Sequence, residues 1–455
     1  MVILISKIYI VITVVILLIY TIRHYLFTLN RLFSDQRIYY QDIIDSKLKK
    51  ISVLIPMHNE EKVAGQILDL LVTGSDTYDN TLIEPNKILD LLISADYPHN
   101  KLEIIPINDF SSDSTQSILE EYARHYPIVK PIHRYEGDPG KPAALNEAIK
   151  RATGEIIIVF DADYLPPKGI LKDITACFND PEIGAVMGRV VPVNTKANLL
   201  ARMLDLERSG GYQVDQQARY NLKLTPQYGG TVGGFRRDIV KSLGYFDTKI
   251  LAEDTELTFR LLINGWKVTY ANRAECYEEV PETWDVRARQ ISRWSRGHNQ
   301  VMFRYLWPVI SSKNLSFKEK LDGILLLFVY TVPLILLLAF FDLLALFYIG
   351  EMNIVSGVSA LIFVGAYNTF GNFAPFFQIG VATLLDNSTR RVLLLPLLLF
   401  NYFFNTWFIA IGFLGALIDI ITGRKSKWEK TERFRKKNQG LPGTILKLRG
   451  QNRDN

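Results

Sequence analysis

The sequence predicts an α/β domain with a largely parallel sheet, placed between apolar segments that are long enough to cross a membrane. Residues 50–310 have the composition of an ordinary soluble domain, whereas apolar residues gather at the N-terminus and in the last third of the chain. Within the middle part, short β-branched runs alternate with helical patterns. This alternation is typical of a sheet that helices cover on both faces.

Three short runs rich in β-branched residues are the predicted strands, at residues 51–56, 101–108 and 155–160. Helical patterns lie between them, at residues 62–71 and 114–125. In sheets of this kind, ligands bind at the carboxyl ends of the strands. Polar clusters follow the second and third runs, so we expect the functional site at that edge of the sheet.

The first apolar segment, residues 2–22, is long enough to span a bilayer. A cleaved signal peptide is the competing interpretation, but basic and bulky residues follow the segment in place of a small-residue cleavage site. We therefore expect an uncleaved anchor at residues 1–28. Several Arg and Lys residues follow this anchor and only Lys7 lies near its other end, so the positive-inside rule places residues 50–310 in the cytoplasm.

A predicted membrane region at residues 321–421 precedes a basic tail at residues 422–455, which we also place in the cytoplasm. A domain and a tail on one side require an even number of spans between them, so we expect the middle apolar block to break near residues 368–372, or one block to lie along the interface. The sequence thus predicts a multi-pass plasma-membrane protein. Its three apolar blocks are residues 321–348, 354–385 and 392–421.

Charge and cysteine content exclude several classes of protein. The net charge of +5 is modest, and the basic residues gather beside the apolar segments, which favours anionic lipid over nucleic acid as a partner. Cys177 and Cys276 match neither a disulfide framework nor a zinc spacing. Residues 137–142 (GDPGKP) lack the spacing of a phosphate-binding P-loop, and no G-x-G-x-x-G follows a strand. We therefore expect neither a nucleoside triphosphatase nor a dinucleotide-dependent enzyme.

Two carboxylates, Asp161 and Asp163, directly follow the third predicted strand. Alternate residues at a strand exit can direct both carboxylates into one space, and two like charges that close are costly without a cation. Oxygen ligands suit Mg²⁺ or Mn²⁺, which usually bind substrate phosphates as well. A capping pair in a loop is the simpler alternative, but the position after an apolar strand favours a metal site.

Two further acidic sites fall at predicted element ends. Asp109, after the second strand, suits hydrogen bonding to a base or a ribose, although a turn with a helix cap has the same composition. Glu253 and Asp254 precede an amphipathic helix at residues 255–264. A helix N-terminus stabilises a carboxylate anion, as a general base requires, although a plain cap fits equally well. A glycosidase would also pair two carboxylates, but it needs no D-x-D metal site.

Gln290, Arg293 and Trp294 share one face of a predicted helix, because they recur at positions i, i+3 and i+4. A guanidinium beside an indole suits a diphosphate and a sugar ring, since Arg binds oxyanions and aromatic rings stack on sugars. The alternative is an amphipathic helix that lies on the membrane, as the arginines at positions 287–296 would allow. Both interpretations can hold together.

Taken in chain order, these segments resemble the processive family 2 glycosyltransferases, which include the cellulose, hyaluronan, chitin and poly-N-acetylglucosamine synthases. Each motif alone is common, whereas the ordered set is specific and extends over residues 50–310, the membrane pattern and the tail. The matching segments are 55–60 (IPMHNE), 108–109 (ND), 140–146 (GKPAALN), 161–163 (DAD), 229–237 (GGTVGGFRR), 252–254 (AED), 281–283 (PET), 290–294 (QISRW) and 428–433 (WEKTER).

The resemblance implies a GT-A fold, a Rossmann-like mixed sheet, and inverting transfer of a hexose from a nucleotide-diphosphate sugar, most readily a UDP-sugar. It implies Asp254 as the catalytic base beside Glu253, and Asp163 as the ligand of Mg²⁺ or Mn²⁺. The implied donor-binding residues are Asp109, Asp161, Lys141 and Arg293. The implied acceptor-binding residues are Gln290, Trp294 and Gly233. The tail residues implied to lie near the diphosphate are Trp428, Lys430, Thr431 and Arg433.

The acceptor stays open between two enzymatic alternatives. A growing polysaccharide, extended processively, is the first, and addition of one sugar to a lipid acceptor is the second. A membrane transport or scaffold protein with a degenerate nucleotide-binding fold is an alternative of another class, which the intact acidic residues disfavour; partner subunits are left open. Polar residues inside the apolar segments could line a glycan path or join helices. These are Asp342, Asn368, Asn372, Gln378, Asn401 and Asn405.

Overall fold

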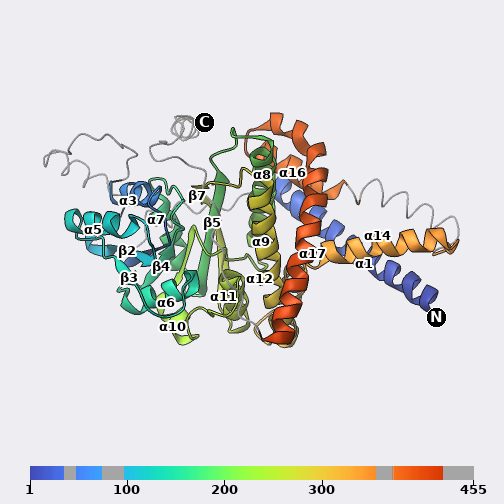
Figure 1. The fold of residues 1–455 in the computed structure, drawn as a ribbon, viewed down its shortest axis with the longest axis horizontal. Coiled ribbons are helices and arrows are strands. Elements are labelled where there is room, and N and C mark those ends of the chain that lie inside the picture. Colours follow the sequence, from blue (N-terminus) through green and yellow to red (C-terminus); the bar gives the residue numbers. More distant parts are fainter. Residues whose placement is uncertain (35–47, 74–96, 355–370, 372, 424–455) are drawn as a thin grey trace.

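A seven-stranded mixed sheet forms the centre of the middle domain in the computed structural model, which describes residues 1–34, 48–73, 97–354, 371 and 373–423 (Figure 1). The strand order is β3-β2-β1-β4-β6-β5-β7. β6 runs antiparallel to its neighbours β4 and β5, and the other pairs are parallel. The strands are β1 (Ile51–Met57), β2 (Leu102–Asp109), β3 (Ile132–Arg134), β4 (Ile156–Val159), β5 (Ile183–Pro192), β6 (Gly233–Arg236) and β7 (Lys267–Glu278).

The three predicted strands are confirmed as β1, β2 and β4, and they lie side by side at the centre of the sheet. Their apolar runs are buried on both faces, as parallel strands between helix layers require. The two predicted helices are confirmed as α3 and α5. One face of the sheet packs on α3 (Ala64–Thr73), α5 (Thr115–His125) and α7 (Ile170–Ala176). The other packs on α6 (Lys141–Arg151), α10 (Arg237–Ser242), α11 (Glu253–Ile263) and the end of α12 (Trp284–Ser311).

Apolar helices stand beside the domain, on the side of β5 and β7 (Figure 1). They are α1 (Val2–Phe33), α13 (Phe317–Leu327), α14 (Val332–Tyr348), α16 (Ala374–Leu385), the 3₁₀ segment η5 (Thr389–Leu397) and α17 (Leu398–Thr422). Among the described residues, α1 and the stretch Thr389–Thr422 are each long and apolar enough to cross a membrane, while α13 and α14 would form a third span bent by 63°. The predicted break near residues 368–372 lies almost wholly outside the described residues.

Three short elements connect β5 to the rest of the domain and face the apolar helices. They are α8 (Leu199–Ser209), the π-helix η3 (Gly210–Gln216) and α9 (Gln217–Asn221). π-Helical turns are rare and often occur at functional sites. Here η3 contacts both α1 and α16, so it joins the membrane-side helices to the domain.

Two arginines in the second half of α1, Arg23 and Arg31, bind protein groups, so for these two the expected contact with lipid headgroups is replaced by contacts within the protein. Arg23 lies 2.6 Å from Asp215 and 3.7 Å from Asp322. Arg31 is buried and donates from Nε to the carbonyl oxygen of Gln213 at 2.6 Å. The second half of α1 is therefore docked on η3 by buried polar contacts.

Several polar residues of the apolar segments likewise contact the domain. Gln378 of α16 bonds to His24 and donates to the carbonyl oxygen of Gly210 at 3.2 Å. Asn401 and Asn405 of α17 both donate to one carboxylate of α8. These contacts favour the helix-joining role for these three side chains, whereas residues 368 and 372 lie outside the described part of the chain.

Replacing Arg23 with Ala should destabilise the protein, because the partly buried Asp215 and the buried Asp322 would lose one of the two arginines that pair with them. Removing one partner of a buried ion pair costs about 3 kcal/mol. Thermal melting of the purified protein in detergent measures this loss. The control is Lys7→Ala on the same helix, which breaks a more exposed pair with Glu351 and should cost less than about 1 kcal/mol. Equal melting temperatures for the two variants would contradict the assignment of Arg23 to a stabilising ion pair with Asp215 and Asp322.

Candidate active site

A cavity of about 1280 Å³ opens at the carboxyl ends of the central strands and continues toward the apolar helices. Its walls come from the ends of β1, β2, β4 and β7, the first turns of α6 and α11, the α8–η3 segment, and α12. Nine of the residues expected from the sequence line it, although they are far apart in the chain. They are Asp109, Lys141, Asp161, Asp163, Glu253, Asp254, Gln290, Arg293 and Trp294.

Two expectations about the site concern residues outside this set: Gly233 does not line the cavity, and the expectation for the tail is not tested. Gly233 lies inside β6, where an added Cβ would come within 2.3 Å of the Val186 carbonyl oxygen, so this glycine permits close strand packing and does not line the cavity. In the same glycine-rich segment, Gly229 lines the cavity. Its neighbour Gly230 packs against the proposed base: its φ of +74° favours glycine, and an added Cβ would lie 3.1 Å from the Asp254 Cβ. The tail residues Trp428, Lys430, Thr431 and Arg433 lie outside the described residues.

Asp109 is fixed at the end of β2 by two donors. The backbone N–H of Gly140 donates to its Oδ2 at 2.7 Å, and Arg134 pairs with its Oδ1. Burial raises the pKa of Asp109, while the Gly140 bond and the Arg134 charge act against that rise. No sequence motif indicated Arg134, a single cation at the end of the short strand β3.

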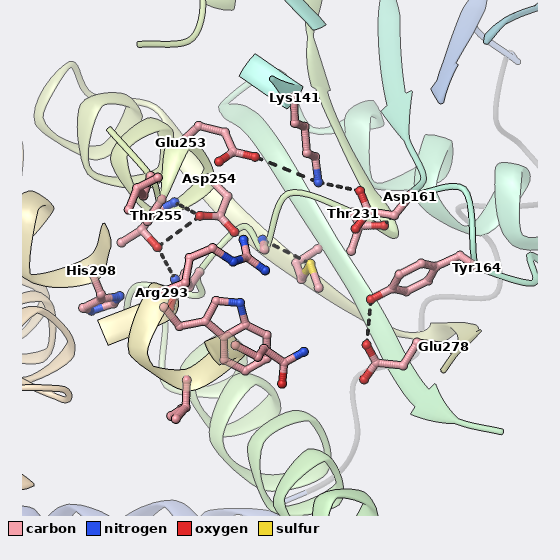
Figure 2. Close-up of a pocket in the computed structure, with 18 of the residues that line it drawn as sticks. Lys141, Asp161, Tyr164, Thr231, Glu253, Asp254, Thr255, Glu278, Arg293 and His298 are labelled. Carbon is pink, nitrogen blue, oxygen red and sulfur yellow. Dashed lines mark hydrogen bonds and ion pairs between the residues drawn. The ribbon is translucent and has the colours of Figure 1, made fainter. Parts of the chain in front are cut away.

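Lys141 links the two acidic motifs of the cavity (Figure 2). Its Nζ lies 2.6 Å from Asp161 Oδ1 and 3.9 Å from Glu253 Oε1. Burial alone would lower the pKa of Lys141, but the charges of Asp161 and Glu253 outweigh this effect and raise it. The lysine therefore stays a cation at the point where two acidic motifs meet, a suitable position for contacting a phosphate.

Glu253 and Asp254 occupy the first turn of α11, as expected, and both line the cavity. Asp254 Oδ1 accepts the backbone N–H of Thr255 at 2.6 Å (Figure 2). A helix N-terminus favours the carboxylate anion, but burial acts in the opposite direction, is the larger effect and raises the pKa of both carboxyls. Burial raises the pKa of Glu253 to about 7, against the opposing charge of Lys141.

Asp161 and Asp163 provide the ligands that a divalent ion would need. Among the residues that the structure describes, no three His, Cys, Asp or Glu side chains converge to hold a metal alone. Mg²⁺ and Mn²⁺ commonly bind through one or two carboxylates and complete their shell with substrate phosphates. Asp163, only 2% exposed and on the cavity wall, fits this donor set, while Asp161 is shared with Lys141.

Gln290, Arg293 and Trp294 share one face of α12 and point at the cavity, as predicted. Two guanidinium groups flank the indole of Trp294, that of Arg208 at 5.1 Å and that of Arg287 at 5.7 Å from the ring centroid.

The arginines of α12 make contacts with protein groups. Arg287 is 4% exposed and pairs with Glu207 at 2.7 Å, while Arg296 pairs with Asp419 of α17. α12 also packs closely on α17, where a Cβ on Gly412 would lie 2.4 Å from the Ser292 carbonyl oxygen. These contacts disfavour a helix that lies with its arginines on the membrane.

The mixed sheet, the acidic pair after β4 and the second acidic pair at the start of α11 define a domain of the GT-A class. Residues 86–297 match the family model described as "Glycosyltransferase like family 2". Residues 86–297 are therefore similar to the family 2 glycosyltransferases.

Three curated relatives are similar to this chain. YdaM of Bacillus subtilis, described as a probable glycosyltransferase, is 35% identical over 263 residues, 57% of this chain and 58% of the relative. The poly-β-1,6-N-acetyl-D-glucosamine synthase of Staphylococcus epidermidis is 28% identical over 283 residues, 61% and 65% of the two chains. The β-monoglucosyldiacylglycerol synthase of Synechocystis is 30% identical over 244 residues, 52% and 49%. The chain thus spans about half to two thirds of these relatives.

One solved structure confirms the fold. A mannosyltransferase from Pyrobaculum calidifontis, in complex with GDP-Man and Mn²⁺, superposes with a TM-score of 0.52 over 83% of this chain and 98% of its own. The sequence identity is 21%, so this likeness concerns the fold alone.

Proposed function

We propose that this chain is an inverting, metal-dependent glycosyltransferase that moves a hexose from a nucleotide-diphosphate sugar to an acceptor at the cytoplasmic face of the membrane. The observation that carries the proposal is the convergence of three acidic motifs with Lys141, Arg293 and Trp294 around one cavity. The family 2 match supports the reaction class. The two long apolar helices support a membrane location.

In this proposal, each side chain meets one demand of the reaction. Asp254 accepts the proton of the acceptor hydroxyl as that oxygen attacks the anomeric carbon, and Glu253 adjusts the charge beside it. Lys141 and Arg293 reach the cavity from opposite sides and stabilise the negative charge of the leaving diphosphate (Figure 2). Asp109 holds the nucleoside and Trp294 the acceptor sugar. Mg²⁺ or Mn²⁺, held by Asp163, would supply further positive charge for the diphosphate.

Polysaccharide extension is the acceptor reaction that we favour. Gln290, Arg293 and Trp294 form a continuous wall beside the proposed base, suited to a glycan end. The similarity to a poly-β-1,6-N-acetyl-D-glucosamine synthase agrees with this choice.

A lipid acceptor is the second candidate. The cavity reaches Leu326 and Val329 at the bend between α13 and α14, and Ile409 of α17, so its far end has apolar walls beside the membrane-side helices. The similarity to a β-monoglucosyldiacylglycerol synthase points the same way.

A donor screen with the purified full chain tests the proposal and separates the acceptors. UDP-glucose, UDP-N-acetylglucosamine and GDP-mannose, each radiolabelled, are supplied with Mg²⁺ or Mn²⁺, in detergent and in vesicles that contain diacylglycerol. Long products on a sizing gel support polysaccharide extension, and a single-sugar lipid on thin-layer plates supports the alternative. If no donor were either transferred or hydrolysed, the proposal would be overturned. The alternative of a non-catalytic transport or scaffold protein would then be favoured.

Replacing Lys141 with Met should move the acid limb of the pH–rate profile to higher pH. The lysine charge lowers the pKa of Glu253 and of Asp254, so its removal raises both values, and the base is then ionised only in more alkaline solution. The measurement is kcat/KM for the donor between pH 5 and 9. Lys150→Met, at the exposed end of the same helix, is the control and should leave the profile unchanged. An acid limb that stays in place for Lys141→Met would contradict the charge link.

A further inference from the structure

Arg208 of α8 connects the indole of Trp294 to a buried carboxylate. Its guanidinium lies 5.1 Å from the ring centroid. Its Nε donates to Glu278 Oε1 at 2.6 Å, and its Nη2 donates to Glu278 Oε2 at 3.3 Å. A guanidinium has a planar set of donors, so a carboxylate that accepts two of them fixes its plane as well as its position. The contact on the indole is therefore set by Glu278, at the end of β7.

The same carboxylate is held from the loop that carries the proposed metal ligand. Tyr164 follows Asp163 directly in the chain and donates its hydroxyl to Glu278 Oε2 at 2.9 Å (Figure 2). The next residue, Leu165, donates its backbone N–H to the Tyr277 carbonyl oxygen at 2.9 Å, so backbone and side chain join this loop to the end of β7. Asp163 and Glu278 are thereby joined through one short loop.

Burial and charge keep this set of contacts intact. Tyr164 and Glu278 are 7% and 6% exposed, so water competes little for their hydrogen bonds. Burial acts to lower the pKa of Arg208, but Glu278 outweighs it and raises that pKa. The Arg208 guanidinium therefore keeps the charge that its contact with Glu278 needs.

We infer that Arg208 is a positioning residue that sets the ring plane of Trp294 for the acceptor sugar, and that Glu278 and Tyr164 fix Arg208 from the loop that carries Asp163. The inference rests on the proposed role of Trp294 in acceptor binding. Its consequence is a coupling between the two halves of the site. Binding of the metal and the diphosphate at Asp163 changes the position of the Trp294 ring, where the acceptor sugar binds.

Fluorescence of the purified protein tests the ring contact without any substrate. The chain has six tryptophans, so each variant is compared with the same variant carrying Trp294→Phe, and the difference reports Trp294 alone. Arg208→Lys and Tyr164→Phe should each change the emission and acrylamide quenching of that difference signal. Arg236→Lys is the matched control, since Arg236 lies 5.6 Å from the Phe178 ring, outside the cavity lining. It should leave the signal unchanged.

Kinetics with the donor found in the screen test the acceptor role. Arg208→Lys should raise the KM for the acceptor about tenfold, because Lys keeps the positive charge but loses the planar guanidinium, and part of a desolvated cation–π contact corresponds to that factor. The KM for the donor should change less than about twofold. Tyr164→Phe should have a smaller effect of the same kind, because Glu278 still holds Arg208. The double variant should cost less than the sum of the single ones, since both act through one carboxylate.

Each outcome decides one part of the inference. An unchanged Trp294 signal in Arg208→Lys, with a normal melting temperature, would overturn the ring contact. A changed signal with an unchanged acceptor KM would overturn the acceptor role. Complete additivity of Arg208→Lys and Tyr164→Phe would overturn the coupling through Glu278. If Arg208→Lys changed the Trp294 signal but the wild-type protein transferred no sugar, the ring contact would be upheld and the proposed function rejected.

Discussion

Asp254→Asn is expected to lower the rate of sugar transfer by on the order of 10²–10⁴, the usual cost of losing a general base. Asn is nearly identical in shape, but it cannot accept the proton of the acceptor hydroxyl. Donor binding should persist, because Lys141, Arg293 and Asp163 remain in place around the cavity. The measurement is a single-turnover transfer rate, together with the Kd of the nucleoside diphosphate.

Stability should not fall in this variant, which separates loss of chemistry from loss of fold. Burial raises the pKa of Asp254, so the folded protein disfavours its charged form at neutral pH, and a neutral amide removes that penalty. The amide can still accept the Thr255 N–H. Asp238→Asn, an exposed position outside the cavity lining, is the control for the substitution itself. Wild-type turnover by Asp254→Asn would reject the base assignment.

Asp163→Asn is expected to lower transfer by on the order of 10²–10³, the cost typical of removing one preorganised electrostatic contact from a site. The amide removes the charged oxygen that we assign to Mg²⁺ or Mn²⁺. Unlike Asp254→Asn, this variant should also bind nucleoside diphosphate more weakly, because Asp163 would hold the ion whose positive charge favours the phosphates.

Titration of Mn²⁺ by electron paramagnetic resonance, with and without nucleoside diphosphate, measures this effect directly. The wild type should bind Mn²⁺ more tightly when the nucleotide is present, and Asp163→Asn should lose most of that gain. Asp180→Asn, on the surface after α7, is the control. If Asp163→Asn bound Mn²⁺ and nucleotide as the wild type does, the metal would have to lie elsewhere.

Local patterns were sufficient for the central strands and for most of the site. β1, β2 and β4 are apolar runs that end in polar residues, and their burial needs no detailed knowledge of their neighbours. Parallel strands bring their carboxyl ends to one edge, so Asp109 and Asp161 had to lie near each other. The helical spacing of Gln290, Arg293 and Trp294 likewise placed them on one face.

The glycine-rich segment shows where local patterns stop. Gly230 and Gly233 look alike in the sequence, yet Gly230 leaves room for Asp254 and Gly233 leaves room for β5. Only the path of the neighbouring segments distinguishes them. The same holds for Glu253, whose pKa depends on burial by segments distant in the chain and on Lys141, more than on its own helix.

The sequence by itself determined the class of domain, its central strands and the order of its acidic motifs, because periodicity and strand ends are properties of short segments. The tertiary structure decided which individual polar side chains meet. Arg23 meets Asp215, and both Tyr164 and Arg208 meet Glu278. These partners lie 70 to 192 positions apart in the chain. Ion pairs and hydrogen bonds depend on distances of a few ångströms, which are fixed only when the whole chain has packed.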